Sequence, residues 1–529
     1  MQFRLGRRAA LASLLASAAL ARGARAQPDL LRIGALTDSP VDPHWLYLSS
    51  NMAYSQHIFD ALSYKNDRSQ AGPGLASSWR VLDERRWEFT LREGVRFHDG
   101  TPLTADDVAF TIERVPALAG NPGPYTPNLR GINDVQVLDA RRLILTTAGP
   151  VPTLPANLGS IYVVSRRAAT GAQPADFRAG RAAIGTGPYR FAAYAPNERL
   201  ELLRNDDYFG AKPAFARVLF RPIPNAAARA AALLAGEVDL IDFVPPELLA
   251  GLARSPAVQV LSAPSDRVIY LVPDVAREVS PFVRARDGAP LATNPLRDVR
   301  VRRAMSLAIN REALCRQTMD GLAEPAGQLV PRGYLGHSDA LAPPAYDIAR
   351  AQALLAEAGY PQGFQLTLHG PNDRYVNDAR VAQAVGAMLT RAGIETQVET
   401  MPRTTFFGRA NLPKREFSLH LIGWGSSGDG EAGYGLSTLI HTTVRERGLG
   451  AINNGGYSNP AVDAAIGEAL AAFERAAREA ALQKAMRLAM EDVAVIPLYV
   501  QYTTVAVRRG LAYAVRDDEK TLAMNAKPA

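Results

Sequence analysis

Trp87-Glu-Phe-Thr-Leu-Arg-Glu-Gly-Val-Arg-Phe-His-Asp-Gly-Thr-Pro-Leu-Thr-Ala-Asp-Asp-Val-Ala-Phe110 is the stretch of sequence that says most about the fold. Its first six residues alternate apolar and polar side chains, which predicts a half-buried strand. Asp99-Gly100 predicts a turn, and Thr104 with Asp107 has the spacing of a capping box at the start of a helix. The stretch therefore predicts a strand, a turn and a helix in succession.

The mixture of strands and helices continues along the chain. A helix over Ala226–Ala235 precedes an apolar strand over Val238–Phe243. Farther on, a strand over Phe364–His369, a helix over Val376–Ala392 and a strand beginning at Ile394 predict a βαβ unit. Helices that alternate with strands are typical of α/β layering, so α/β is the predicted fold class.

Length and composition indicate several globular units. The chain has 529 residues, of which 47% are apolar and 21% charged, and this is too long for one small domain. The segment Arg277–Pro295 is charged, rich in proline and glycine, and without periodicity, so we expect a boundary between two lobes there. We expect a second crossing between the lobes near Val493. The turn-rich stretch Pro116–Pro155 predicts an inserted subdomain.

The first 26 residues have the pattern of an export signal. Arginines precede a mostly apolar run over Ala9–Leu20, and Ala24-Arg25-Ala26 is similar to a signal-peptide cleavage site. Arg7-Arg8 leaves open whether the signal is of the Sec or the twin-arginine type, and an uncleaved anchor is the alternative. Because the segment holds five arginines and no acid, its removal lowers the formal charge from +7 to 7 − 5 = +2. We therefore expect no binding of nucleic acid.

Residue types that support catalysis or bind metals do not form recognisable motifs. The seven histidines make no HExxH, and Cys315 is the single cysteine, so we expect no metal site and no internal disulfide. Neither GxSxG nor GxxxxGK[ST] occurs. We expect no enzyme activity and no cofactor. An exported hydrolase, with a triad assembled from distant residues, is the remote alternative.

One glycine-rich stretch, Gly423-Trp-Gly-Ser-Ser-Gly428, matches GxGxxG and follows a strand predicted over Phe417–Ile422. Further glycines follow it instead of a helix, which argues against a dinucleotide site. A loop at the carboxyl end of a strand is where open α/β sheets bind ligands. In this loop Trp424 offers an indole for stacking, while Asp429 and Glu431 offer carboxylates for a cationic group. In the alternative, the loop is a surface feature and Trp424 fills the core.

Four segments, in this order along the chain, resemble the family 5 extracellular solute-binding proteins of ABC importers, the peptide, nickel and opine type. They are Trp87–Phe110, Gly185-Thr-Gly-Pro-Tyr189, Arg300-Val-Arg-Arg-Ala-Met-Ser-Leu-Ala-Ile-Asn310 and Tyr457-Ser-Asn-Pro460. The first is long and specific, and the resemblance extends from about Leu30 to about Gly510.

This resemblance implies a two-lobed periplasmic-binding-protein (Venus-flytrap) fold with an extra subdomain in the first lobe. On that basis we expect residues 27–62, 184–276 and 494–529 to form lobe I. Residues 63–183 would form its inserted subdomain and residues 277–493 lobe II. The ligand would lie between the lobes, and their closure would be what the membrane permease recognises.

The resemblance also implies ligand-binding residues. In dipeptide-binding relatives an arginine before the βαβ helix binds the ligand carboxylate, and Arg374, followed by Asn377, occupies the comparable place. An acid after the Gly-Trp strand binds the amino group, which assigns Asp429 or Glu431. Arg374 in a structural ion pair is the alternative. Trp45 is a further candidate, because the preceding turn either presents its indole to a cleft or lets it pack in the core.

The predicted function is that of a periplasmic receptor. It captures a peptide-like or small polar solute and delivers it to an inner-membrane ABC permease. A receptor for an opine, an oligosaccharide or a metal chelate is the alternative. We expect a monomer, and we expect Sec or twin-arginine export to the periplasm.

Overall fold

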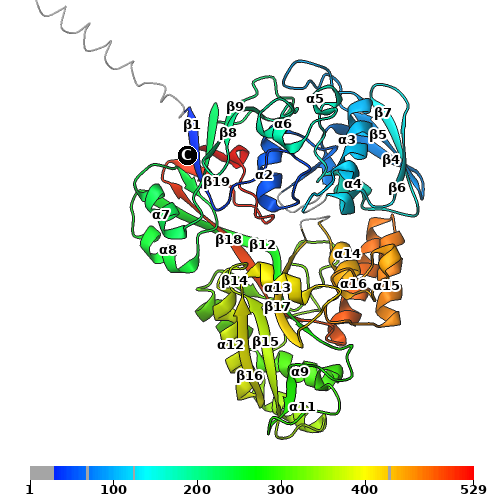
Figure 1. Cartoon of the computed structure of the whole chain (residues 1–529), viewed down its shortest axis with the longest axis vertical. Helices are drawn as coiled ribbons and strands as arrows, with labels where there is room; N and C mark the ends of the chain where they lie inside the picture. The colour runs from blue at the N-terminus through cyan, green and yellow to red at the C-terminus, as the bar shows by residue number, and fades with distance from the viewer. Residues whose placement is uncertain (1–28, 67–70, 123–124, 427–429) are drawn as a thin grey trace, which may run out of the picture.

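The computed structural model describes residues 29–66, 71–122, 125–426 and 430–529. The predicted export signal, 1–26, and Asp429 lie outside these residues. Two lobes share one 12-stranded mixed sheet, whose order is β13-β15-β17-β12-β18-β11-β1-β10-β9-β8, with β16 beside β15 and β14 beside β18. Figure 1 shows β12 and β18 in the middle of the molecule, between the two lobes.

The first lobe is built on β1, which is parallel to both of its neighbours, β10 and β11. Antiparallel strands β9 and β8 complete this side of the sheet. The elements of this lobe are β1 (Leu30–Ala35), α2 (Ser49–Ile58), β8 (Tyr189–Ala195), β9 (Arg199–Arg204), β10 (Arg217–Pro222), α7 (Ala226–Leu234), β11 (Leu240–Ile241) and α8 (Pro246–Ala253). The strand predicted over Val238–Phe243 is therefore shorter than expected, and Phe243 has a positive φ of 45°.

The inserted stretch contains its own four-stranded antiparallel sheet, in the order β4-β5-β7-β6. The predicted capping box of Thr104 and Asp107 is confirmed at the start of α3. The buried side chains of this sheet form one core with those of β1, so the insertion packs onto the first lobe. Its elements are β4 (Ala76–Asp83), β5 (Arg86–Leu91), α3 (Ala105–Ala117), β6 (Ile132–Val137), β7 (Arg142–Thr147), α4 (Leu154–Leu158), α5 (Arg166–Ala169) and α6 (Pro174–Arg178).

The second lobe contains the predicted βαβ unit. It consists of β15 (Phe364–Pro371), α12 (Asp378–Arg391) and β16 (Ile394–Met401), and its strands are parallel. Strand β17 (Leu419–Gly425) is parallel to β15 on the other side. The remaining elements include β13 (Val283–Ala285), α9 (Val299–Ala308), β14 (Ala323–Pro325), α11 (Ile348–Glu357), α13 (Arg403–Ala410), α14 (Ala432–Gly435), α15 (Pro460–Ala471) and α16 (Arg475–Glu491).

Two long antiparallel strands, β12 (Val258–Pro273) and β18 (Ile496–Arg508), connect the lobes. Their pairing runs to Pro264, shifts register, and resumes at Val268. On the first-lobe side β18 pairs with β11, and on the second-lobe side β12 pairs with β17 and β18 with β14. The chain thus passes between lobes inside two continuous strands.

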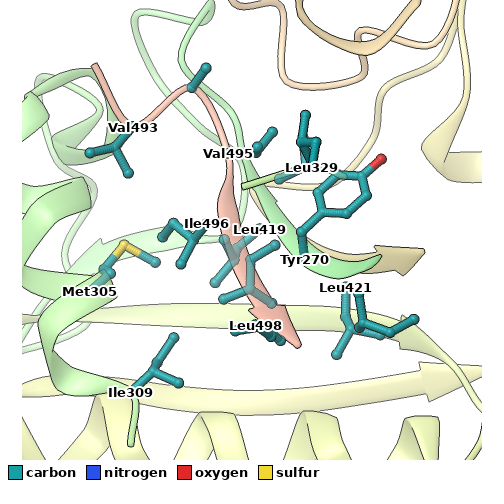
Figure 2. Packing of buried hydrophobic residues seen from close by; sticks show 14 of the residues in the cluster. Tyr270, Met305, Ile309, Leu329, Leu419, Leu421, Val493, Val495, Ile496 and Leu498 are labelled. Atoms are coloured by element: carbon teal, nitrogen blue, oxygen red, sulfur yellow. The ribbon is translucent and has the colours of Figure 1, made fainter. Parts of the chain in front are cut away.

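Packing around these strands bears on the expected boundaries at Arg277 and Val493. Figure 2 shows Tyr270, Ile496 and Leu498 beside Met305 and Leu421, in the core of the second lobe. The packing therefore favours a boundary between the two lobes near the register shift of β12. This position is several residues from the boundaries expected at Arg277 and Val493. The proline- and glycine-rich segment marks a surface connection after β12, whereas the crossing lies inside β12, where Pro264-Ser265-Asp266 remains part of one continuous strand.

The lobes also meet away from the two strands. The ring of Phe473, between α15 and α16, lies 5.8 Å from that of Trp87 in β5. Arg130 Nη1 donates to the carbonyls of Arg447 and Gly448, at 3.3 and 3.2 Å. In Figure 1, α15 and α16 accordingly lie beneath the sheet of the inserted segment.

Candidate functional site

The carboxyl ends of several second-lobe strands meet at the junction with the first lobe. β15 and β17 are parallel, so the segments that follow Pro371 and Gly425 leave the sheet at the same edge. β12 is antiparallel to β17, with Arg267 opposite Gly425, so the start of this pairing lies at that edge too. The topology thus brings Arg374, Trp424 and the charged residues of β12 to one place.

Arg374 follows β15 and is only partly exposed. Its backbone N–H donates to Asp378 Oδ2 at 2.9 Å, and its guanidinium lies over the Tyr375 ring, 5.0 Å from the centroid. Within the described residues the guanidinium forms no ion pair. Burial, and then the positive charge of Arg267, lower the pKa of Arg374 from its ordinary value. A partly buried guanidinium without an ion pair among the described residues is suited to an anionic ligand group.

A central ion pair stands beside Arg374. Arg267 Nε donates to Glu519 Oε1 at 2.9 Å, and Arg267 Nη2 donates to Glu519 Oε2. Tyr375 links this pair to the sheet, because its hydroxyl donates to the carbonyl of Gly423 at 3.2 Å and Arg267 lies 5.9 Å from its ring centroid. The charge of Arg267 is therefore neutralised within the protein, whereas that of Arg374 is not.

Trp424 lies in β17, partly buried against the second-lobe core. Its ring centroid is 5.4 Å from that of Tyr434. Its indole Nε1 is buried without a hydrogen-bond partner in the part of the chain that the structure describes. Trp424 thus packs against the core, with its Nε1 next to Gly435 of α14, and its contact with a ligand stays a prediction.

Glu431 has a different position from the one its predicted role requires. It is 5% exposed and pairs with Arg478 of α16, whose Nε donates to Glu431 Oε2 at 2.7 Å and whose Nη2 donates to Oε1. A carboxylate that is already neutralised by a buried arginine is poorly suited to bind an ammonium group. The geometry favours a structural role for Glu431.

Two other candidates have local structural roles. Asn377 adopts a left-handed conformation, with φ 55°, and its side-chain amide donates to the carbonyl of Thr318 at 2.8 Å. This contact fixes the turn before α12. The helix therefore starts at Asp378, two residues later than the predicted start at Val376. Trp45 is partly buried in the segment after β1, and its backbone N–H donates to the carbonyl of Asp42 at 3.2 Å. The predicted turn before Trp45 is thus present.

Asp266 is a residue that the sequence reasoning missed. It precedes Arg267 at the edge, is 1% exposed, and forms no ion pair with any described residue. Its Oδ2 and the hydroxyl of Ser426, which follows β17, are both buried without a hydrogen-bond partner in the described chain. Burial, and then the charge of Glu519, raise the pKa of Asp266 to about 8. An acid and a base in succession, directly before the apolar run 268–273, are the signal that would have identified it.

Among residues 29–66, 71–122, 125–426 and 430–529, no group of three or more His, Cys, Asp or Glu side chains is arranged to hold a metal ion. Among the same residues, none of the helices is both long and apolar enough to cross a membrane.

Two α/β lobes joined by paired strands, with uncompensated charges at the junction, define a protein that binds a solute between lobes. The sequence profile of the bacterial extracellular solute-binding proteins, family 5, matches residues 70–445. Since the match covers more than half of the chain, the protein belongs to this family.

Individual relatives agree with the assignment. The dipeptide-binding protein of Escherichia coli (strain K12) is 26% identical over 420 residues, which cover 73% of each chain. Heme-binding protein A of Haemophilus influenzae is 26% identical over 484 residues, 85% of this chain and 83% of that one. The periplasmic binding protein DppA of Helicobacter pylori, solved in complex with the peptide STSA, has a TM-score of 0.75 and 23% identity. That comparison covers 95% of this chain and 98% of that one.

The family and the fold confirm the predicted class, a solute-binding protein of the ABC-importer type with two α/β lobes. The family is one of binding proteins rather than enzymes, and its members are periplasmic or extracellular.

Proposed function

We propose that this protein is a periplasmic receptor for a short peptide-like solute that carries a carboxylate, which it delivers to an ABC permease. The guanidinium of Arg374 is the observation that carries the proposal. It is partly buried at the junction of the lobes, stands next to a second arginine, and lacks an ion pair among the described residues. A carboxylate in bidentate contact would neutralise it.

Two relatives support a peptide rather than another anion. One is a dipeptide-binding protein, and a structural neighbour was solved with a bound peptide. Peptides carry a terminal carboxylate, and Trp424 adds an aromatic surface at the same edge. The permease would recognise the ligand-bound arrangement of the lobes, so the protein acts by binding and not by chemistry.

The test is a thermal-shift screen of the chain from Gln27 onward. The panel holds di- and tripeptides, the same peptides with an amidated carboxyl terminus, and heme, opines, oligosaccharides and nickel chelates. A ligand that binds only the folded state stabilises it by about 2.7 kcal/mol at a hundredfold excess over its Kd. We expect shifts with free peptides and smaller ones with their amides. Shifts confined to another class of compound would overturn the proposal.

Arg374→Ala tests the residue that carries the proposal. Loss of charge-assisted hydrogen bonds of about 1.5–3 kcal/mol is expected to weaken peptide binding by about 10- to 150-fold. The melting temperature of the ligand-free protein should change little, because no partner is left unpaired. Arg391→Ala, an exposed position at the other end of α12, is the matched control. Equal affinity of the two variants would refute the role of Arg374.

A further inference from the structure

The motif suggested two acids as the anionic counterpart of the cationic half of the proposed site, Asp429 and Glu431, of which the structure describes Glu431 alone. Glu431 is neutralised by Arg478. Glu519, the acid at the centre of the junction, is neutralised by Arg267. A peptide with a free amino terminus nevertheless brings an ammonium group, which needs a carboxylate without a partner of its own.

Asp266 is a carboxyl group without an ion-pair partner among the described residues, and it lies at the edge of the sheet from which the Arg374 segment leaves. Its neighbour in sequence, Arg267, is opposite Gly425, and a side chain added at Gly425 would begin 2.8 Å from Asp266 Oδ1. The carboxyl group therefore lies directly against the backbone at the end of β17. Ser426 follows at the next position, and its buried hydroxyl has no hydrogen-bond partner among the described residues. The end of β17 thus carries a hydroxyl one residue beyond the point that the Asp266 carboxyl group contacts.

We propose that Asp266 binds the α-ammonium group of the peptide, with Ser426 as a second acceptor, while Arg374 binds the carboxylate. The site then takes a zwitterion, with one charge held by β12 and the other by the segment that follows β15. This inference rests on the proposed function and goes further, because it restricts the ligand to peptides with an unblocked amino terminus.

The electrostatic surroundings of Asp266 agree with this role. Burial raises its pKa first, and the acids of the C-terminal segment, Glu519, Asp517 and Asp518, raise it further, against the opposing effect of Arg267. The carboxyl group therefore keeps a proton at neutral pH in the ligand-free protein. A ligand ammonium would favour the ionised form, so the carboxyl group gives its proton to the solvent while the ammonium keeps its own.

The test compares alanyl-phenylalanine and glutathione with their N-acetylated forms, by isothermal titration calorimetry on the chain from Gln27 onward. For the unchanged protein we expect acetylation to weaken binding at least tenfold. For Asp266→Asn we expect the free and acetylated peptides to bind alike, with the affinity that the unchanged protein has for the acetylated form. Titration at pH 7 in phosphate and in Tris should show release of close to one proton, lost in the variant.

The possible failures are distinguishable. If the unchanged protein binds neither form of either peptide, the proposed function fails and this inference fails with it. If it binds free and acetylated forms equally, or if Asp266→Asn still prefers the free amine, the function stands and the role of Asp266 is refuted. Equal heats in both buffers would also contradict it. Asp274→Asn is the control, since Asp274 directly follows β12, is also buried, and pairs with Arg277.

Discussion

The ion pair between Glu431 and Arg478 allows a quantitative prediction for Glu431→Gln. The two side chains are 7% and 6% exposed, and they make two charge-assisted hydrogen bonds between the start of α14 and α16. Replacement by a neutral amide leaves the arginine charge buried and uncompensated. Breaking a buried pair in this way typically destabilises by about 3–5 kcal/mol. For a lobe of about 200 residues, ~4 kcal/mol corresponds to a melting temperature lower by ~8–16 °C.

Urea denaturation followed by circular dichroism measures this loss, and a nearby exposed pair supplies the control. Glu468 and Lys484 join α15 to α16 at 2.9 Å, with side chains 56% and 48% exposed. Glu468→Gln should change the free energy of unfolding by less than about 1 kcal/mol. If the two variants lose equal stability, the reasoning from burial is refuted. Peptide affinity per folded molecule should remain unchanged in both.

Three further predictions concern close packing, lobe contact and pH. Gly185→Ala places a methyl group on a backbone carbonyl of α2 and should destabilise the protein by ~3 kcal/mol in urea denaturation. Gly251→Ala, at a position in α8 with open space around it, should stabilise the protein slightly. Equal effects of the two variants would contradict the packing argument. Phe473→Ala removes the ring contact with Trp87 and should speed peptide dissociation about 2- to 10-fold in stopped-flow measurements. An unchanged dissociation rate would exclude a role for this contact in holding the lobes closed. Asp266 has a pKa of about 8 in the folded protein and an ordinary value of 3.8. Between about pH 4 and 8 the folded protein therefore keeps a proton that the unfolded chain has lost. The free energy of unfolding falls as the pH rises through this window. Asp266→Asn lacks this dependence and should become progressively more stable than the unchanged protein over the same range, while parallel denaturation curves would refute the raised pKa.

The elements of the fold were predictable where local chemistry decides them. The βαβ unit over 364–401 follows from apolar periodicity and a closing glycine, and the start of α3 from a capping box. The crossing of the chain between lobes was not predictable in the same way. It occurs inside the 16-residue strand β12, whose pairing with β18 shifts register between Pro264 and Val268, and tertiary packing divides that strand between two cores.

The site was partly predictable. Arg374 could be named because the family pattern places an arginine before α12, and the structure brings it to the junction. The partner of Glu431 could not be named, because Arg478 lies 47 residues farther along the chain on another helix. Likewise, nothing local shows that Asp266 faces the end of β17, since strand pairing alone brings them together.

The two acids illustrate how function is separated from stability in this protein. Position in a motif suggested Glu431, but a receptor must keep an unpaired charge where its ligand binds, and Glu431 is paired. Asp266 carries no such partner within the described residues, and its burial works against the folded state until a ligand cation arrives. Removal of the two carboxylates is therefore expected to have opposite effects: Glu431→Gln lowers stability and leaves binding intact, whereas Asp266→Asn raises stability and abolishes the preference for a free amine. Ionisable groups without a partner at the lobe junction, and not position in the sequence motif, therefore carry the proposed ligand contacts.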